Sequence, residues 1–286
     1  MANDLFNIAA VVVLYNPDDT VFDKFQTYFN SVNFCYVVDN STNINKALVE
    51  KFQAIEKVEY IKLDGNKGIA NALNVGAKKA LYDGFDFLLT MDQDSRVFPC
   101  MIESMAKIIL KDPSFGILSP QHLDLNYNRY FDEEIEESIA VKTSGNLLNL
   151  NAFKEVGDFN EHFFIDYVDI EYCFRVIEKG YKVARVRDAL LGHREANLHI
   201  RKYLGIKLFI QDHSPLRVYY KSRNRFYLLD KYLKKFPEYF QRESPQYRNL
   251  LIKIFLFEKQ KFKKLYYAFL GYYHYKKQIT GKFPNS

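Results

Sequence analysis

Apolar and polar residues alternate along the first hundred residues in blocks that predict strands followed by helices. Four short runs are rich in β-branched and aromatic residues, which is typical of strands buried on both faces: Ile8–Tyr15, Phe34–Val38, Val58–Leu63 and Phe85–Thr90. Segments with helical periodicity lie between them, and the third of these starts after Gly68 and is ended by Gly84. Strand–helix units with short connections predict an α/β fold with a mainly parallel central sheet.

The second half of the chain has a less regular pattern, with mixed helical and strand character from about residue 100 onward. Its clearest helix has apolar residues at the i, i+4, i+7 spacing from Ile170 and is followed by Gly180 as a C-cap. Beyond residue 230 the pattern is helical. We therefore expect one domain over residues 1–230 and a helical extension over residues 231–286.

The composition is that of a globular protein, since 48% of the 286 residues are apolar and 26% are charged. These values exclude disordered, collagen-like and low-complexity classes. Three scattered cysteines are too few for a disulfide framework or a cysteine-based zinc site. The first ten residues lack a cationic signal region, and no apolar run approaches the ~18 residues that cross a bilayer. We therefore expect a cytoplasmic location.

Charge is unevenly distributed along the chain. Residues 246–286 contain nine Lys or Arg and a single acid, Glu258, so this tail has a net charge of +8, while the remainder is at −3. Aromatic residues recur at helical spacing in the tail, and lysines flank them. The tail predicts either an interfacial helix on anionic lipid or a helix packed on the protein or on a second copy. Nucleic acid is not an expected partner, because the remainder is acidic and lacks a recognition motif.

Polar side chains cluster where the predicted strands end, which is the edge at which parallel α/β sheets bind ligands. Asp92 and Asp94 follow the fourth strand at positions i and i+2 and project to the same side of an extended chain. Such a pair suits a hard divalent cation that holds phosphate oxygens. The sequence Asp-Gln-Asp-Ser is equally typical of a turn, so both alternatives stay open.

Two other strand ends carry weaker signals. Asp39 could accept the imide N–H of uracil or thymine, or could simply form an Asx turn. Asn66 and Gly68 begin a helix whose free N–H groups could face a phosphate, or could be no more than a helix start.

The segment 163–175 holds a second group of carboxylates. Asp166 and Asp169 have an ordinary explanation as helix-capping residues, while the functional alternative makes Asp169 a general base at the mouth of a cleft. His193 follows a strand-like stretch and is either an ordinary histidine or a third ligand beside carboxylates, which would favour Mn²⁺.

Eight motifs occur in one order over residues 8–230: VVVLYN, VVDN, GNKGIANALNVG, TMDQDS, TSGNLL, FFIDYVDIEYCFR, LGH and RVYYKSRNRFYLL. In this combination the chain resembles the family-2 glycosyltransferases of the GT-A fold. The residues of the motifs DQDS, FFIDYVDIEY and YYKSRNRFYLL are most similar to those of the bacterial branch that uses dTDP-L-rhamnose.

The resemblance implies a role for each matching position on the nucleotide side. Asp39 would bind the pyrimidine base, and Asp94 would be the principal ligand of Mn²⁺ or Mg²⁺, with His193 as a second ligand. The other residues implied near the nucleotide, with Asp92 also near the metal, are Leu14, Tyr15, Asn16, Asn66, Gly68 and Asp92.

The resemblance also implies the residues around the reacting sugar. Asp169 matches the catalytic base, but Val168 replaces the usual acidic neighbour, so Asp166 or Glu171 could share the task. Arg223 would close over the diphosphate or the acceptor. The remaining residues implied at the acceptor or the donor sugar are Thr143, Ser144, Gly145, Asn146, Asp166, Tyr219 and Tyr220.

The resulting hypothesis is an inverting, metal-dependent transferase that moves L-rhamnose from dTDP-L-rhamnose onto a growing, lipid-linked bacterial surface polysaccharide. It would act at the inner face of the cell membrane as a peripheral protein. The alternatives are a transferase that uses a UDP-sugar, a nucleotidyltransferase-like enzyme, and a catalytically silent relative that only binds glycans.

Overall fold

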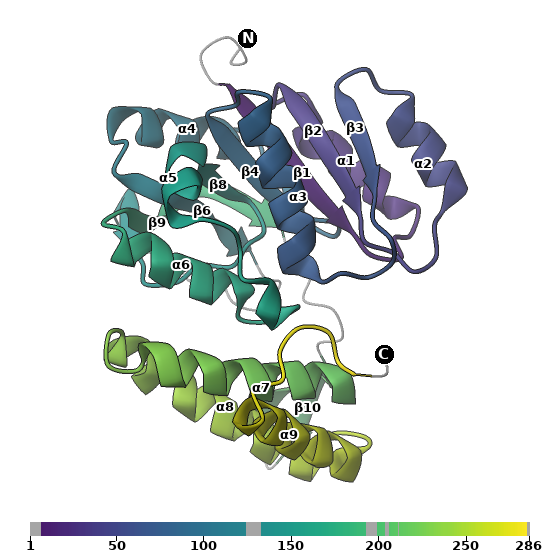
Figure 1. Cartoon of the computed structure of the whole chain (residues 1–286), viewed down its shortest axis with the longest axis vertical. Helices are drawn as coiled ribbons and strands as arrows, with labels where there is room; N and C mark the ends of the chain where they lie inside the picture. Colours follow the sequence, from purple (N-terminus) through teal and green to yellow (C-terminus); the bar gives the residue numbers. More distant parts are fainter. Residues whose placement is uncertain (1–6, 124–132, 193–198, 204–205, 211, 285–286) are drawn as a thin grey trace. The chain divides into compact units, whose positions relative to one another are not determined.

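Strand β1 (Ile8–Leu14) is buried along its whole length and forms the centre of a parallel half-sheet (Figure 1). Its seven residues are all apolar, because both faces of the strand are covered. The sheet order is β3-β2-β1-β4, and every pair in it is parallel. The elements of this half are α1 (Thr20–Phe29), β2 (Phe34–Asp39), α2 (Lys46–Gln53), β3 (Val58–Lys62), α3 (Ile69–Tyr82) and β4 (Phe87–Asp92).

The computed structural model describes residues 7–123, 133–192, 199–203, 206–210 and 212–284. Two compact units make up the chain: Met1–Glu161 with Val168–Arg194, and His162–Tyr167 with Glu195–Ser286. The boundary that we expected after residue 230 falls inside a helix of the second unit.

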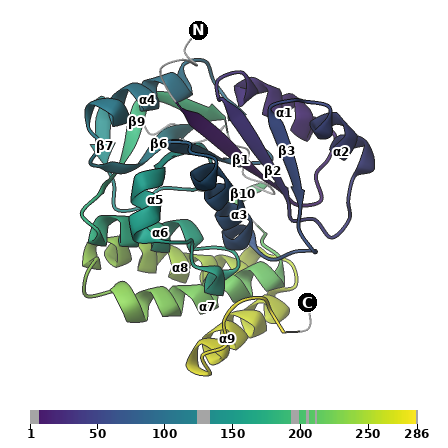
Figure 2. The ribbon, with the colours of Figure 1, turned by 45° about the horizontal axis from the view of Figure 1, so that its top comes forward.

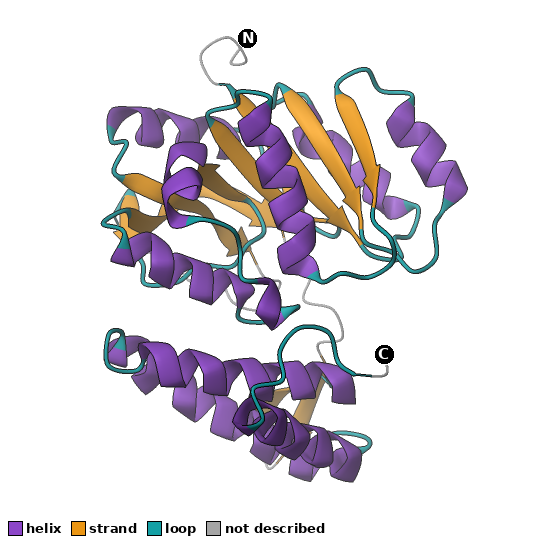
Figure 3. Cartoon of the chain, viewed as in Figure 1, coloured by secondary structure: helices purple, strands orange, loops and turns teal. Residues whose placement is uncertain are grey.

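The other half of the first unit is mixed rather than parallel (Figure 3). Strand β8 (Asn146–Asn149) lies antiparallel between β4 and β6 (Phe115–Leu123), and β9 (Lys182–Gly192) pairs parallel to β6. Two short strands, β5 (Arg96–Val97) and β7 (Ile135–Glu137), pair antiparallel with β9. The helical elements here are α4 (Met101–Lys111), α5 (Leu150–Val156) and α6 (Val168–Glu178), and the short η1 (Glu161–Phe163) begins at the last residue before the second unit.

The direction of β8 brings its amino end to the carboxyl end of β4, where Thr90 pairs with Asn146. A positive φ of 82° at Gly145 makes the turn into β8. A Cβ atom at this glycine would lie only 2.6 Å from Cγ of Pro120, so any other residue is excluded by both conformation and space. The antiparallel insertion therefore places the segment 143–146 at the sheet edge where the parallel strands end.

Helices cover both faces of the sheet (Figure 2), and alternate residues of β1 face the two helix layers. Ala10 and Val12 pack in one cluster with residues of α1, α2 and α4. Val11 faces the opposite side, where α3 lies against it at Gly76. The period of two in a strand thus distributes a continuous apolar run over both faces of the sheet.

The second unit contains a hairpin of β10 (His199–Tyr203) and β11 (Ile206–Ile210), followed by three helices: α7 (Pro215–Tyr232), α8 (Pro237–Phe257) and α9 (Lys261–Lys276). Ser214 caps α7 by accepting a hydrogen bond from the backbone N–H of Arg217 at 3.2 Å. Helix α9 packs on α7 at Gly271, where a Cβ atom would lie 2.6 Å from the carbonyl oxygen of Tyr219. The absence of a side chain at residue 271 therefore permits this close helix contact.

Among the helices of the described residues, none combines the length and the apolar character that a bilayer span requires.

We predict that Gly76→Ala destabilises the protein although alanine is the better helix former. A Cβ atom here would lie 2.3 Å from Cγ2 of Val11, in a buried contact. Overpacking costs about 1–3 kcal/mol, which exceeds the gain in helix propensity of about 0.5–1 kcal/mol. Urea unfolding should show the loss. Tyr82→Ala, at an exposed position of the same helix, should change the free energy of unfolding by less than about 0.5 kcal/mol. Unchanged stability in Gly76→Ala would contradict the close contact.

Candidate active site

The loop after β1 is joined to the acidic loop after β4 by the side chain of Gln93. The backbone N–H of Tyr15 donates to Oε1 of Gln93 at 2.8 Å, and Nε2 of Gln93 donates to the carbonyl oxygen of Tyr15 at 3.2 Å. Asn16, in the left-handed region at a φ of 45°, donates its N–H to Oγ of Ser41 at 2.7 Å. The ends of β1, β2 and β4 are therefore linked directly, and the predicted residues Leu14–Asn16 lie beside them.

Asp39 is the buried last residue of β2, and its carboxylate has two partners within the protein. Oδ1 accepts the backbone N–H of Ser41 at 2.9 Å, which is the Asx-type contact anticipated from the sequence. Oδ2 accepts the hydroxyl of Tyr60 at 2.5 Å. Burial and this hydrogen bond raise the pKa of Tyr60, so the phenol keeps its proton and remains a donor. Each carboxylate oxygen has a second lone pair, which leaves acceptor capacity for a base N–H.

Asn66 and Gly68 form the start of α3. Oδ1 of Asn66 accepts from Nδ2 of Asn40 at 3.1 Å and from the backbone N–H of Gly68 at 3.0 Å. Gly68 has a φ of 91°, a conformation that favours glycine. The backbone N–H of Lys67 donates to Oδ1 of Asn40 at 2.7 Å. These contacts shape the entry to the helix, which is the ordinary explanation that the sequence left open.

The acidic loop is anchored by its serine while its carboxylates stay partly exposed. Ser95 is buried, and its Oγ lies 2.7 Å from Oγ of Ser144. The same Ser144 hydroxyl accepts the backbone N–H of Asp92 at 3.2 Å. Asp92 and Asp94 are each intermediate in exposure. The hydroxyl pair therefore holds the backbone and leaves two oxygen-bearing side chains at the edge of the sheet.

The segment 143–146 is held against the end of β4 by further hydrogen bonds. Oγ1 of Thr90 donates to the carbonyl oxygen of Thr143 at 2.6 Å, and the backbone N–H of Gly145 donates to the carbonyl oxygen of Thr90 at 2.7 Å. Nε2 of His122 lies 2.8 Å from the carbonyl oxygen of Ser144 and donates to it. The TSGN and DQDS motifs therefore form one hydrogen-bonded unit, although their serines, Ser95 and Ser144, are 49 residues apart in sequence.

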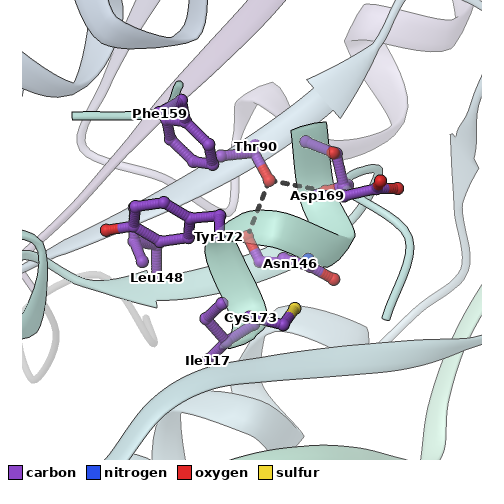
Figure 4. Close-up of a pocket in the computed structure, with 9 residues that line it drawn as sticks. Thr90, Ile117, Asn146, Leu148, Phe159, Asp169, Tyr172 and Cys173 are labelled. Atoms are coloured by element: carbon purple, nitrogen blue, oxygen red, sulfur yellow. Dashed lines mark hydrogen bonds between the residues drawn. The ribbon is translucent and has the colours of Figure 1, made fainter. Parts of the chain in front are cut away.

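A pocket in the first unit contains Asp169, the second residue of α6 (Figure 4). Asp169 is intermediate in exposure, and its Oδ1 accepts the backbone N–H of Ile170 at 2.9 Å. Burial raises the pKa of the Cys173 thiol to about 12, so this group is neutral at ordinary pH. The residues that line the pocket are Thr90, Ile117, Thr143, Asn146, Leu148, Phe159, Asp169, Tyr172 and Cys173.

The pocket unites the proposed base with two of the predicted sugar-binding positions, Thr143 and Asn146. Glu171 cannot share the task of the base, because it is buried and bonded to Nε of Arg175 at 2.9 Å. Arg175 in turn donates to the carbonyl oxygens of Val156 and Asp158 at 3.1 and 2.7 Å. Glu171 and Arg175 therefore join α6 to the chain before it.

Arg223 does not have the role that we expected, because the side chain is fully buried in the second unit. Its guanidinium donates to the carbonyl oxygens of Gly281 at 2.7 Å, His162 at 3.1 Å and Phe163 at 3.3 Å. Tyr219 and Tyr220 are buried beside it, with their rings 5.3 and 5.1 Å from the guanidinium carbon. These three residues form a core and do not close over a diphosphate or an acceptor, since their polar atoms are used within the protein.

Asn224 completes this arrangement, which we call the carbonyl clamp: the side chains of Arg223 and Asn224 bonded to the backbone of residues 162–166. Nδ2 of Asn224 donates to the carbonyl oxygens of Phe163 and Ile165 at 2.8 Å each and of Asp166 at 3.0 Å. The clamped segment has left-handed backbone conformations at Phe164, Asp166 and Tyr167, with φ between 62° and 64°. Such backbone is costly for residues other than glycine, and the clamp holds it in place.

Asp166 belongs to this segment and faces cations of α7. Its Oδ1 lies 3.3 Å from Nη2 of Arg217 and 3.5 Å from Nζ of Lys221, while Oδ2 is buried without a hydrogen-bond partner. The same two cations act on His213: burial, Lys221 and Arg217 lower the pKa of its imidazole to about 4, so this group is neutral at physiological pH. Asp166 is not the N-cap that we expected, because α6 begins at Val168 and the capping position before it is Tyr167.

His193, the second metal ligand implied by the resemblance, lies outside the described residues. Within the part of the chain that is described, no group of three His, Cys, Asp or Glu side chains is placed to hold a metal ion. The carboxylates of Asp92 and Asp94 offer the oxygen donors that Mg²⁺ and Mn²⁺ prefer, and their backbone is fixed by Ser144 and Gln93. In donor chemistry these two residues fit such an ion.

Residues 13–160 match the sequence profile of Glycosyl transferase family 2. The chain belongs to this family. It is 34% identical over 245 residues to the dTDP-rhamnosyl transferase RfbF of Shigella flexneri, a match that covers 79% of this chain and 80% of that protein. A second relative is the poly-β-1,6-N-acetyl-D-glucosamine synthase of Staphylococcus aureus (strain MSSA476), 26% identical over 121 residues, with 41% of this chain and 29% of the synthase covered.

Solved structures share the fold of this family-2 glycosyltransferase. GalNAc-T7 with UDP, GalNAc and Mn²⁺ superposes with a TM-score of 0.62 at 15% identity, over 96% of this chain and 56% of that chain. S. aureus TarS 1–349 in complex with UDP-GlcNAc gives a TM-score of 0.60 at 15% identity, over 96% and 81% of the two chains. The expected GT-A fold is confirmed, and the enzyme is a glycosyltransferase rather than a nucleotidyltransferase.

Sequence reasoning did not single out several residues that shape this glycosyltransferase. Gln93 and Ser95 lie inside the DQDS motif, so their position beside the two aspartates was a usable signal. Asn224 lies beside Arg223 in a quoted motif, yet nothing in that motif distinguishes a buried clamp from a ligand contact. Tyr60 and His122 carried no signal, because their partners are distant in sequence.

We predict that Asn224→Ala loosens the segment before α6. The substitution removes the amide donor of the Ile165 and Asp166 carbonyl oxygens, while the Phe163 oxygen keeps its hydrogen bonds from Arg223 and from the N–H of Ile165. A buried carbonyl left without a donor costs about 1–3 kcal/mol. Hydrogen–deuterium exchange of residues 162–167 should be faster by about tenfold or more. Asp230→Ala, at an exposed position of the same helix, should leave this exchange unchanged. Equal protection in both variants would show that the clamp does not hold the segment.

Proposed function

We propose that this glycosyltransferase moves L-rhamnose from dTDP-L-rhamnose onto a hydroxyl group of a growing, lipid-linked surface polysaccharide. The match to a dTDP-rhamnosyl transferase over about four-fifths of both chains supports the donor. The observation that carries the chemistry is that Asp169 shares a pocket with Thr143 and Asn146, whose segment is bonded to the Asp92–Ser95 loop.

Asp169 would act as the general base. The acceptor hydroxyl loses its proton to the carboxylate as its oxygen bonds to the anomeric carbon, and the electron pair of the old bond leaves with dTDP. One in-line displacement inverts the anomeric centre. Base assistance of this kind contributes ~10²–10⁴-fold to the rate. Thr143 and Asn146, which line the same pocket as Asp169, would lie beside the sugar.

The nucleotide would lie along the strand ends. Asp39 would accept the N–H of the thymine ring, with the backbone of residues 14–16 beside the base. Asn66 and Gly68 would lie near the diphosphate, at the start of α3. Asp166, held between Arg217 and Lys221, remains our candidate for recognition of the acceptor or of the donor sugar.

Asp94, Asp92 and His193 would hold Mn²⁺ or Mg²⁺. A divalent ion bound there supplies positive charge that offsets the charge of the departing diphosphate. The two carboxylates suit this ion by their oxygen donors, and the related fold of GalNAc-T7 was solved with UDP and Mn²⁺. The protein itself contributes the fixed loop, through the Gln93 and Ser95 hydrogen bonds.

We predict that Asp169→Asn abolishes rhamnosyl transfer from dTDP-L-rhamnose while leaving the affinity for dTDP within about twofold. The amide cannot take the proton, and a loss of ~10²-fold or more is expected. Product formation is measured by chromatography, and nucleotide affinity by calorimetry. Glu178→Gln, at an exposed site of the same helix, is the control. Normal turnover in Asp169→Asn would remove this residue from the mechanism. Transfer from UDP-sugars and not from dTDP-L-rhamnose would contradict the proposed donor.

We predict that Asp94→Ala removes the metal-dependent part of nucleotide binding. In the unaltered protein, dTDP with Mn²⁺ should raise the thermal midpoint more than dTDP with a chelator, because Asp94 would hold the ion whose positive charge favours binding of the diphosphate. The variant should give the same midpoint in both conditions. Glu56→Ala, an exposed acid between α2 and β3, should behave like the unaltered protein. A full Mn²⁺ effect in Asp94→Ala would exclude this residue as a ligand.

A further inference from the structure

Helix α9 exposes a stripe of four aromatic side chains, Phe262, Tyr266, Phe269 and Tyr273. They recur at i, i+4, i+7 and i+11, so they lie on one face of the helix. Their exposed fractions are between 46% and 74%. Single exposed apolar residues are normal on a protein surface, but an aligned series of large ones marks an interaction site.

The opposite face of α9 already has its partner. Lys264, Ala268 and Gly271 are buried, and they follow Phe262, Tyr266 and Phe269 by two residues, which is a rotation of about 200° around the helix. Gly271 contacts the backbone of α7 at Tyr219. The orientation of α9 is therefore set by its packing inside the second unit, and this packing turns the aromatic stripe outward.

Helix α8 extends this apolar surface. Ile252, Phe255 and Leu256 near its carboxyl end are exposed by 47–55%. Nζ of Lys261 lies 5.6 Å from the ring centroid of Phe255 and 5.6 Å from that of Phe262, so the two helices meet here with their exposed faces adjacent. We call the combined surface the α8–α9 strip; it consists of Ile252, Phe255, Leu256, Phe262, Tyr266, Phe269 and Tyr273.

The charge that residues 246–286 contribute around the α8–α9 strip is positive. Glu258, the single acid of residues 246–286, is buried and bonded to the buried Lys264 at 2.7 Å. Lys264 also binds Asp212 at 2.5 Å. The other bases of residues 246–286 are exposed or partly exposed, and they are Arg248, Lys253, Lys259, Lys261, Lys263, Lys276, Lys277 and Lys282.

We propose that the α8–α9 strip docks this protein on an anionic lipid bilayer. Aromatic side chains can enter the boundary between headgroups and acyl chains, while the lysines face the anionic headgroups. Each lysine near such a surface adds to the electrostatic attraction, and salt weakens this contribution. A second copy of the chain is a poorer occupant, because its own strip carries the same positive charge. The inference deepens the proposed function, since a lipid-linked acceptor is itself presented at a membrane.

The test is flotation of the full-length protein with vesicles. One set contains phosphatidylglycerol mixed with phosphatidylcholine, and the other contains phosphatidylcholine alone. We expect the protein to float with the anionic vesicles, to be released as salt rises, and to stay behind with the neutral ones. The double variant Phe262→Ser/Phe269→Ser should lower the partition coefficient by about tenfold or more, because two exposed rings lose their insertion.

Tyr82→Ser is the matched control, since Tyr82 is an exposed aromatic residue on α3, a helix of the other compact unit. Circular dichroism verifies that each variant is folded. Flotation of the strip variant equal to that of the control would overturn the proposal, as would equal binding to neutral vesicles. A dimer that ultracentrifugation detects in the unaltered protein and not in the strip variant, without flotation of either, would assign the surface to a second copy.

Failure of this inference is distinguishable from failure of the proposed function. The strip variant should retain rhamnosyl transfer to a water-soluble acceptor analogue and should lose only the advantage of vesicle-bound acceptor. An unaltered protein that floats yet transfers no rhamnose would contradict the proposed function and leave the docking surface in place.

Discussion

The site depends on the pairing of β8 with β4 in antiparallel direction. This pairing brings Asn146 opposite Thr90, and the turn at Gly145 then closes onto the end of β4. Ser144 meets Ser95 in the same place, so the acidic loop and the sugar-side segment share one set of hydrogen bonds. If the strand ran parallel, its amino end would lie at the other edge of the sheet, and these motifs would be separated by the length of a strand.

In the second unit, two buried side chains direct their hydrogen bonds to backbone carbonyl oxygens. The guanidinium of Arg223 and the amide of Asn224 together satisfy carbonyl oxygens of His162, Phe163 and Ile165. A buried charge is tolerated here because several oxygens and two tyrosine rings surround it. The segment that is held in this way runs directly into α6 and Asp169, so the clamp supports the chain next to the proposed base.

Helix α9 shows how one amphipathic pattern can serve two partners. Small residues at positions 268 and 271 allow close packing on α7, and aromatic residues on the opposite side remain exposed. The sequence pattern indicated aromatic residues at helical spacing flanked by lysines, and the structure shows which apolar residues stay exposed. Leu251 and Leu265 pack inside the unit, and Glu258, the C-cap of α8, pairs with Lys264.

Local patterns were sufficient to predict the parallel half-sheet, its helices and the polar strand ends, because buried strands and helix starts are specified by neighbouring residues. They also located Asp169 at the start of α6. The sequence could not decide whether Arg223 and Glu171 reach a ligand or pack inside. The type of a charged residue does not by itself tell whether its side chain is buried or exposed. Burial and hydrogen-bond partners arise from contacts between residues far apart in the chain, and only the tertiary structure brings those residues together.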